Sequence, residues 1–117
     1  LKPKHSGFFA TALDTLLQYL GVRTLVLTGA TSHQCVLFTA NDAYVRDLQL
    51  VIPRDCLAAR RPSDTALALR YFRAVLDADV GDSHRVRFAP GIRGPRRPAA
   101  GGRGGRSPPR RRRARPT

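Results

Sequence analysis

The sequence predicts an α/β fold: a partial doubly wound (Rossmann-like) parallel sheet with flanking helices, followed by a disordered basic tail. Two observations carry this prediction. Short apolar segments alternate with longer amphipathic segments, which is the order of parallel strands joined by right-handed helical crossovers. The composition then changes abruptly near residue 90, where large apolar residues become rare and arginine, glycine and proline dominate. We therefore divide the chain into a domain at residues 1–90 and a tail at residues 91–117.

A first helix is expected to begin near Thr11, because Thr11 and Asp14 have the spacing of a capping box with Asp in place of Glu. Leucines follow on one helical face, at positions 13, 16, 17 and 20, and Gly21 stands where a helix usually ends. Residues 24–28 (TLVLT) are β-branched and apolar and stop at a glycine, so they predict a short buried strand.

Residues 35–47 predict a second helix, and residues 48–52 predict a second buried strand that ends at a proline. Ser63 is the predicted N-cap of a third helix, and residues 86–88 predict a last short strand. The apolar faces of the second and third helices are predicted to comprise Val36, Ala40, Ala43 and Tyr44, and Leu69, Phe72, Val75 and Leu76.

Only two or three strands can be assigned in this way, whereas a doubly wound sheet has about five or six. We therefore expect strands to be missing from the front, so that residues 1–90 are the C-terminal part of a domain. The lack of methionine and the start at Leu1 are also what a fragment would show. We expect this chain alone to be inactive and poorly folded, because an opened parallel sheet exposes unpaired edges.

The positive charge of the chain belongs mainly to the tail. Residues 1–90 hold 11 Lys and Arg against 8 Asp, a net charge of +3, whereas residues 91–117 hold 10 Arg and no acid. A tail of this composition cannot bury enough surface to offset the entropy of ordering it. The arginines at 110–113 could neutralise phosphates of a nucleic acid, but no aromatic residues are interleaved for base stacking. A solvated extension, or a frame error in GC-rich DNA, explains the tail better.

The location of the protein is constrained by what the sequence does not contain. No run approaches the roughly 18 apolar residues of a membrane span, and no signal peptide is visible. The two cysteines, Cys35 and Cys56, are too few for a disulfide framework. We expect a reducing, cytoplasmic setting and no contact with a membrane.

Cys35 is the strongest candidate for chemistry. It follows the first predicted strand and a small, polar turn (GATS), and it stands where the second helix begins. Unpaired backbone N–H groups and the positive end of the helix dipole favour a thiolate there, and the same N–H groups could form an oxyanion hole. Two lysines at the start of the chain offer a cationic partner. The alternative is that Cys35 is a small core residue.

Four segments in order resemble the isochorismatase-like cysteine hydrolases. Residues 2–13 (KPKHSGFFATAL) resemble the family's K-x-x-x-S-x-F-x-x-T-x-L segment, and residues 29–36 (GATSHQCV) its nucleophile turn G-x-x-T/S-x-x-C-V. Residues 38–43 (FTANDA) are similar to the T-A-x-D-A helix that follows, and residues 51–56 (VIPRDC) to the next strand and its loop. The likeness covers about residues 1–80.

This resemblance implies hydrolysis of a C–N bond in a small amide, ureide or carbamoyl compound, through an Asp–Lys–Cys triad and a thioester acyl-enzyme. It makes Cys35 the nucleophile and Lys2, four residues before Ser6, the triad lysine; Lys4 is the second choice. It also implies a cis peptide bond between Ala30 and Thr31, with the amides of Thr31 and Cys35 as the oxyanion-hole donors.

The family's triad aspartate lies on its first strand, upstream of the lysine, and Asp14 lies after the lysine and is no substitute. Some members bind a metal through that upstream half, so no metal site and no cofactor are assigned here. Full-length relatives are usually homo-oligomers, and we expect the same of the whole protein. The alternatives are an inactive remnant, or a non-catalytic protein whose basic tail binds nucleic acid.

The remaining polar residues carry less weight. His33 is expected to face solvent, His5 occupies a position that is often aromatic in the family, and His84 begins an edge segment. The three histidines show no metal-ligand spacing. Asp42 is expected to make a structural pair, and Cys56 to be a small buried residue in a corner of the chain.

Overall fold

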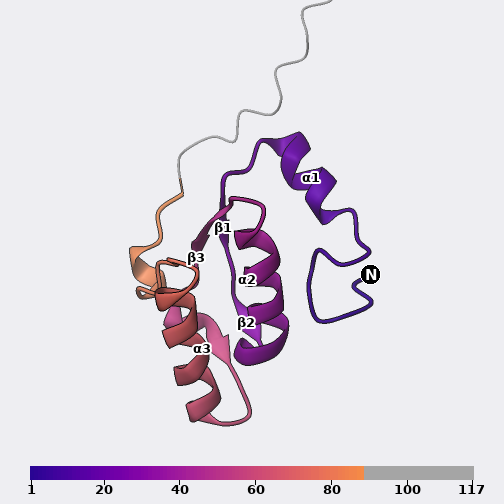
Figure 1. The fold of residues 1–117 in the computed structure, drawn as a ribbon. Coiled ribbons are helices and arrows are strands. Elements are labelled where there is room, and N and C mark those ends of the chain that lie inside the picture. Colours follow the sequence, from indigo (N-terminus) through magenta and orange to yellow (C-terminus); the bar gives the residue numbers. More distant parts are fainter. Residues whose placement is uncertain (89–117) are drawn as a thin grey trace, which may run out of the picture.

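The computed structural model describes residues 1–88, and the predicted disordered tail at 91–117 lies outside the described residues. Three helices and four short strands follow one another in the order expected of an α/β domain (Figure 1). They are α1 (Leu13–Leu20), β1 (Thr24–Val26), β2 (Gly29–Ala30), α2 (Leu37–Tyr44), β3 (Gln49–Val51), β4 (Leu57–Ala58) and α3 (Pro62–Ala74). A π-helical turn at Ser32–Val36 precedes α2, and 3₁₀ turns occupy Arg54–Cys56 and Ser83–Arg85.

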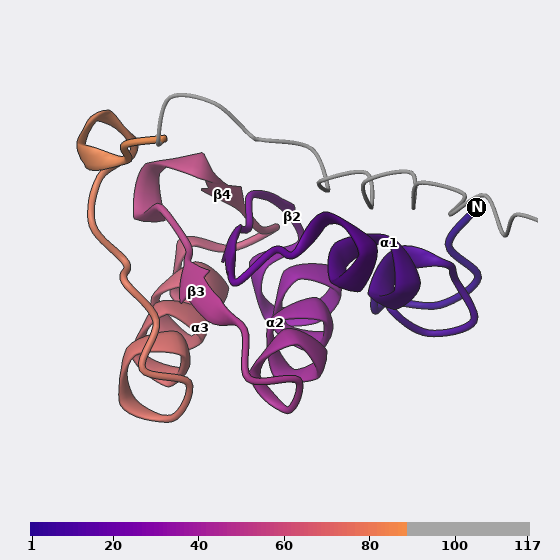
Figure 2. The ribbon, with the colours of Figure 1, turned by 90° about the horizontal axis from the view of Figure 1, so that it is seen from above.

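All strand pairings among residues 1–88 are parallel, as the alternation of strands and helices predicts. β1 pairs with β3, with Leu25 opposite Leu50, and β2 pairs with β4. A third segment joins the far edge of β3, where Asp79 forms a parallel bridge with Val51. Figure 2 shows α2 and α3 side by side along the strands. The predicted parallel α/β architecture is therefore confirmed.

The core lies between the strands and the helices α2 and α3. Phe72 of α3 and Ile52, just after β3, are completely buried. Phe8 joins the core from the segment that precedes α1, although it lies far from the sheet in sequence. The other buried apolar residues are Leu17, Val36, Ala40, Ala43, Leu50, Ala68, Leu76, Ala78 and Val80.

The start of α1 differs from the predicted capping box. Ala12 is the N-cap, and it provides no side-chain hydrogen bond. The Thr11 hydroxyl accepts a hydrogen bond from the Leu13 amide (3.3 Å) but donates to the Gly7 carbonyl (2.6 Å), so it closes the preceding turn as well. Asp14 does not reach back to the helix start, because its carboxylate pairs with Arg46. The helix ends at Gly21 with φ of +66°, as predicted.

The first strand is shorter than predicted and is not buried. β1 comprises only Thr24–Val26, and its side chains alternate between exposed and half-buried. The face that carries Thr24 and Val26 is exposed in the described part of the chain, whereas Leu25 packs against the core. The chain then continues into β2, a strand that the sequence analysis did not assign.

Three further expectations are wrong in detail. α3 begins at Pro62 with Arg61 as the N-cap, since proline is well suited to the first helical position, and Ser63 lies inside the helix. The predicted strand at 86–88 is absent from the described residues, because the chain pairs with β3 earlier, at Asp79. Four residues on the predicted apolar helix faces are instead exposed, namely Leu16 (50%), Leu20 (40%), Tyr44 (46%) and Val75 (50%).

Candidate active site

Cys35 lies on the turn between β2 and α2, near the carboxyl end of β2. The turn is π-helical from Ser32 to Val36, and the Val36 amide donates to the Thr31 carbonyl at 3.2 Å. Cys35 is therefore the fourth residue of this turn and not, as expected, the first residue of the helix. Its side chain is half-buried and its thiol is free. The Thr39 hydroxyl donates to the Cys35 carbonyl at 2.7 Å, which ties the turn to α2.

The backbone before this turn is unusual. Gly29 has φ of +118°, a conformation that favours glycine over residues with a Cβ. The next peptide bond, between Ala30 and Thr31, is cis. The Thr31 carbonyl accepts two hydrogen bonds, from the amides of Gln34 (3.1 Å) and Val36. This places the Thr31 and Cys35 amides, the expected oxyanion-hole donors, on the same short turn.

The Lys2 side chain, near the start of the chain, contacts the thiol of Cys35. Its Nζ lies 3.9 Å from Sγ of Cys35, across 33 positions of sequence. The same ammonium donates to the backbone carbonyls of Lys4 (2.7 Å) and His5 (3.1 Å), which hold it in place. Lys4 is the second choice for the triad lysine. Its backbone carbonyl accepts one of these bonds, and its own ammonium makes no hydrogen bond within residues 1–88. A cation next to a thiol favours the thiolate form.

His5 is a further member of this cluster that the sequence analysis did not assign. Its Nδ1 lies 3.6 Å from Sγ of Cys35. Its ring stacks on Phe38, the second residue of α2, with the centroids 5.5 Å apart and the planes inclined by 22°. The signal in the sequence was a histidine three residues after Lys2, at a position that is often aromatic in the resembling family.

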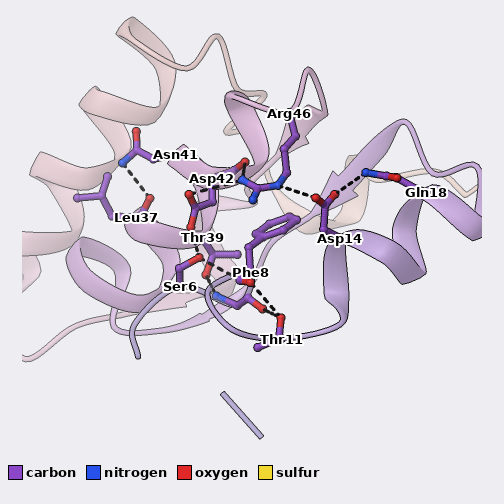
Figure 3. A network of polar contacts seen from close by, with 11 residues as sticks. Ser6, Phe8, Thr11, Asp14, Gln18, Leu37, Thr39, Asn41, Asp42 and Arg46 are labelled. Atoms are coloured by element: carbon purple, nitrogen blue, oxygen red, sulfur yellow. Dashed lines mark hydrogen bonds and ion pairs between the residues drawn. The ribbon is translucent and has the colours of Figure 1, made fainter. Parts of the chain in front are cut away.

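A network of polar contacts fastens the segment that carries Lys2 and His5 to α2 (Figure 3). The buried Ser6 hydroxyl donates to the Asp42 carboxylate, and the Gly7 amide donates to the Thr39 hydroxyl at 3.0 Å. Asp42 thus makes the structural pair expected of it. Because Thr39 also bonds to the Cys35 carbonyl, one hydroxyl connects the N-terminal segment to the nucleophile turn.

Arg46 extends this network to α1. Its guanidinium lies over the Phe8 ring, 4.6 Å from the centroid, and forms ion pairs with Asp14 (3.3 Å) and Asp42 (3.6 Å). Gln18 donates to the other oxygen of Asp14 at 3.1 Å. The network therefore joins α1, the N-terminal segment and α2 around one arginine, which Figure 3 shows at its centre.

The other residues named from the sequence lie outside this cluster. His33 is half-buried, not solvent-facing as expected, and its Nδ1 is buried with no hydrogen-bond partner in residues 1–88. Cys56 is half-buried in the 3₁₀ turn after β3, so the expected buried corner residue is only partly enclosed.

Shifted pKa values occur in the loops after β3 and after α3. The Ser83 hydroxyl and amide donate to Asp55 and hold the pKa of its carboxyl below the ordinary value. Arg54 donates two hydrogen bonds to Asp82, which lowers the pKa of the Asp82 carboxyl and raises the pKa of the guanidinium. These paired groups link the two 3₁₀ turns, so the shifts have a structural cause.

The described part of the chain holds neither a candidate metal site nor a membrane-spanning helix. Within residues 1–88, no three His, Cys, Asp or Glu side chains are grouped so that they could hold a metal ion. Across the same residues, every helix is too short or too polar to cross a membrane.

Comparison with known proteins identifies relatives over the same part of the chain. The family model described as "Isochorismatase domain" matches residues 1–83. The uncharacterized isochorismatase family protein YaaI of Bacillus subtilis is 45% identical over 86 residues, which are 74% of this chain and 48% of that protein. The chain therefore spans about half the length of this curated relative.

Solved structures of amidases share the fold. Nicotinamidase PncA from Bacillus subtilis superposes with a TM-score of 0.66 at 33% identity, covering 68% of this chain and 44% of that one. N-carbamoylsarcosine amidase from Thermoplasma acidophilum superposes with a TM-score of 0.65 at 35% identity, covering 73% of this chain and 47% of that one.

Proposed function

Because the chain belongs to the isochorismatase family, we propose that it is part of a cysteine amidohydrolase. The enzyme hydrolyses the C–N bond of a small amide, ureide or carbamoyl compound through a thioester acyl-enzyme. The observation that carries this proposal is the contact of 3.9 Å between Lys2 and Cys35, two residues that the sequence separates by 33 positions. A lysine and a cysteine brought together in this way form an activated nucleophile.

The reaction is proposed to run in two stages on Cys35. In the first, the thiolate attacks the carbonyl carbon of the substrate, an S–C bond forms, and the oxyanion is held by the amides of Thr31 and Cys35. The C–N bond then breaks, and the leaving nitrogen takes a proton and departs as ammonia or an amine. In the second, water adds to the thioester carbonyl, the C–S bond breaks, and the thiol is restored as the acid leaves.

Lys2 is proposed to stabilise the thiolate in both stages. Its ammonium is fixed by two backbone carbonyls, so its positive charge stays next to Sγ as the charge on sulfur changes. Support for the substrate class comes from the two solved structures, which are named as amidases acting on nicotinamide and on N-carbamoylsarcosine. Both names describe compounds with a C–N bond next to a carbonyl.

We place the protein in the reducing cytoplasm, where Cys35 and Cys56, both free in the structure, stay reduced. We also propose that the whole protein forms a homo-oligomer. Residues 91–117 have no role in the proposed location or in the proposed oligomer.

The test is release of ammonia from nicotinamide and from an N-carbamoyl amino acid by a protein that contains this chain. Cys35→Ala removes the nucleophile and should lower kcat/KM by more than about a thousandfold. Cys56→Ala is the matched control, because it removes the other thiol, and it should keep the rate within about twofold of the parent. Equal rates for the Cys35→Ala variant and the parent would exclude the mechanism.

A further inference from the structure

His5 is placed to exchange a proton with the nucleophile. Its Nδ1 lies 3.6 Å from Sγ of Cys35, within the range of a hydrogen bond to sulfur. The ring stacks on Phe38 at the start of α2, which favours its orientation next to the thiol. The His5 carbonyl also accepts a hydrogen bond from Lys2, so one residue contacts both members of the Lys2–Cys35 pair.

We propose that His5 is a further catalytic residue of this chain, which accepts the thiol proton of Cys35 at Nδ1. This inference rests on the proposed function, since it concerns the same nucleophile. The resemblance leads us to expect an aspartate upstream of Lys2 as the general base, and nothing in that pattern assigns a second base. The imidazole in contact with Sγ supplies one.

The proton balance is simple. The S–H bond of Cys35 breaks, the proton moves to Nδ1 of His5, and a thiolate and an imidazolium remain. The total charge of the pair is unchanged, so the step needs no other reactant. When the thiolate attacks the substrate and the C–N bond breaks, the imidazolium returns its proton to the leaving nitrogen, and His5 is neutral again.

The charged group nearest to the pair is the Lys2 ammonium. The N-terminal segment brings the Lys2 ammonium to Sγ, and that positive charge stabilises the thiolate. The neighbouring groups from α2 are uncharged, namely Phe38 against the ring and the Thr39 hydroxyl on the Cys35 carbonyl. α3 meets the turn through the uncharged Thr65 hydroxyl, which lies 3.0 Å from that of Ser32. Lys4 is another titratable residue near the turn, and its backbone carbonyl accepts a hydrogen bond from Lys2.

Two groups close to the pair in sequence have other surroundings. Asp42 on α2 is occupied by Ser6 and Arg46. His33 lies on the same turn as Cys35, but its Nδ1 is buried without a hydrogen-bond partner in residues 1–88. His33 is therefore the histidine against which a specific effect of His5 can be measured.

The experiment measures the rate at which iodoacetamide alkylates Cys35 as a function of pH. The protein that contains this chain carries Cys56→Ala throughout, so that Cys35 is the only thiol among residues 1–117. His5→Phe keeps an aromatic ring for the stack on Phe38 and removes Nδ1. Because His5→Phe removes the nitrogen that contacts Sγ, the pH at which alkylation begins should rise by about one unit in this variant. At pH 7 the rate should fall about tenfold.

His33→Phe is the matched control, and its profile should coincide with that of the parent. His5→Asn tests whether titration matters: it can form a hydrogen bond to sulfur but cannot hold the proton, so its profile should follow His5→Phe. A parent-like profile in His5→Phe, with the fold retained by circular dichroism, would overturn the proposal. The same change in His33→Phe would also overturn it, because the effect would not belong to His5.

Alkylation needs no substrate, so this result is independent of amide hydrolysis. If the parent hydrolyses amides and His5→Phe leaves both the alkylation profile and kcat unchanged, the role of His5 fails and the proposed function stands. If neither nicotinamide nor an N-carbamoyl amino acid is hydrolysed but the profile moves as expected, the Cys35–His5 pair stands and the proposed function fails.

Discussion

Two side chains from the N-terminal segment meet at the sulfur atom of Cys35. Sγ has the Lys2 ammonium at 3.9 Å and the His5 imidazole at 3.6 Å. The ammonium can only donate a hydrogen bond to the sulfur, whereas an imidazole nitrogen can donate or accept one. The two groups therefore act differently on the thiol, and variants can separate them.

At the residue scale, Lys2→Gln should lower kcat/KM of the proposed amidase by about a hundredfold or more, since it removes the cation that stabilises the thiolate. It should also move alkylation of Cys35 to higher pH. Lys4→Gln is the control, because the Lys4 side chain makes no contact with the thiol and its carbonyl is retained. Steady-state kinetics measure kcat/KM of each variant, and alkylation profiles measure the pH at which Cys35 reacts. Equal losses in the two variants would contradict the assignment of Lys2.

At the scale of elements, the position of Lys2 and His5 depends on the contacts between the N-terminal segment and α2. Residues 1–12 form no helix or strand, so backbone hydrogen bonds alone do not fix them. The Ser6–Asp42 hydrogen bond, the Gly7–Thr39 hydrogen bond and the burial of Phe8 do so instead. The site is thus built from a strand-to-helix turn and a segment held by side chains.

The Ser6–Asp42 hydrogen bond should matter for both stability and activity. Ser6→Ala leaves a carboxylate without its buried partner and should lower the free energy of unfolding by about 1–3 kcal/mol. It should also lower kcat/KM and speed proteolysis within residues 1–12, because the segment detaches from α2. Gln18→Ala removes only an exposed contact to Asp14 and should change stability by less than about 0.5 kcal/mol. Urea titration and limited proteolysis test this; unchanged proteolysis in Ser6→Ala would refute it.

The contact between Asp55 and Ser83, which joins the two 3₁₀ turns, should stabilise the fold in a pH-dependent way. The pKa of Asp55 is lowered in the folded chain, so its charged form stabilises the fold at pH values above the ordinary value near 3.8. This stabilisation is lost as the pH falls below that value and through the folded pKa. Asp55→Asn should therefore lower the urea midpoint at pH 6, and the difference from the parent should shrink as the pH falls below 3.8.

Ser83→Ala is the matching variant, because it removes the hydroxyl that lowers the pKa of Asp55. It should lower the midpoint at pH 6 as well, and the double variant should lose less than the sum of the two single losses. Additive losses, or a difference that does not shrink as the pH falls below 3.8, would show that the Ser83–Asp55 pair does not carry the effect.

At the scale of the whole molecule, the described part packs helices against two short pairs of parallel strands, β1–β3 and β2–β4, and leaves apolar residues exposed. Val26 of β1 is exposed, and Phe88, at the end of the described residues, is 78% exposed. A hollow of about 420 Å³ lies along β1 and β3 and includes both residues in its lining. The expectation that this chain alone folds poorly is consistent with that exposure and stays a prediction.

Much of this fold could be predicted from local sequence. The apolar run at 48–52 forms β3, where Leu50 is buried, and Ile52 just after the strand is buried too. Gly21 ends a helix because it adopts a left-handed conformation. The errors lie where packing against other elements determines exposure. Phe72 and Leu76 of the predicted apolar face are buried, but Val75, just after the last residue of α3, is exposed, and so is Tyr44 at the end of α2. The two-residue strands β2 and β4 exist only as a pair, so neither has a local signal.

The α/β class, the family motifs and the candidates Cys35 and Lys2 could be predicted from the sequence, because apolar spacing and ordered motifs are properties of neighbouring residues. The contact of Lys2 with the sulfur, and the position of His5 beside it, emerge from the folded chain. These contacts join residues that lie about 30 positions apart in the sequence. They depend on how Ser6, Gly7 and Phe8 dock on α2, and no local pattern encodes the position of that docked segment.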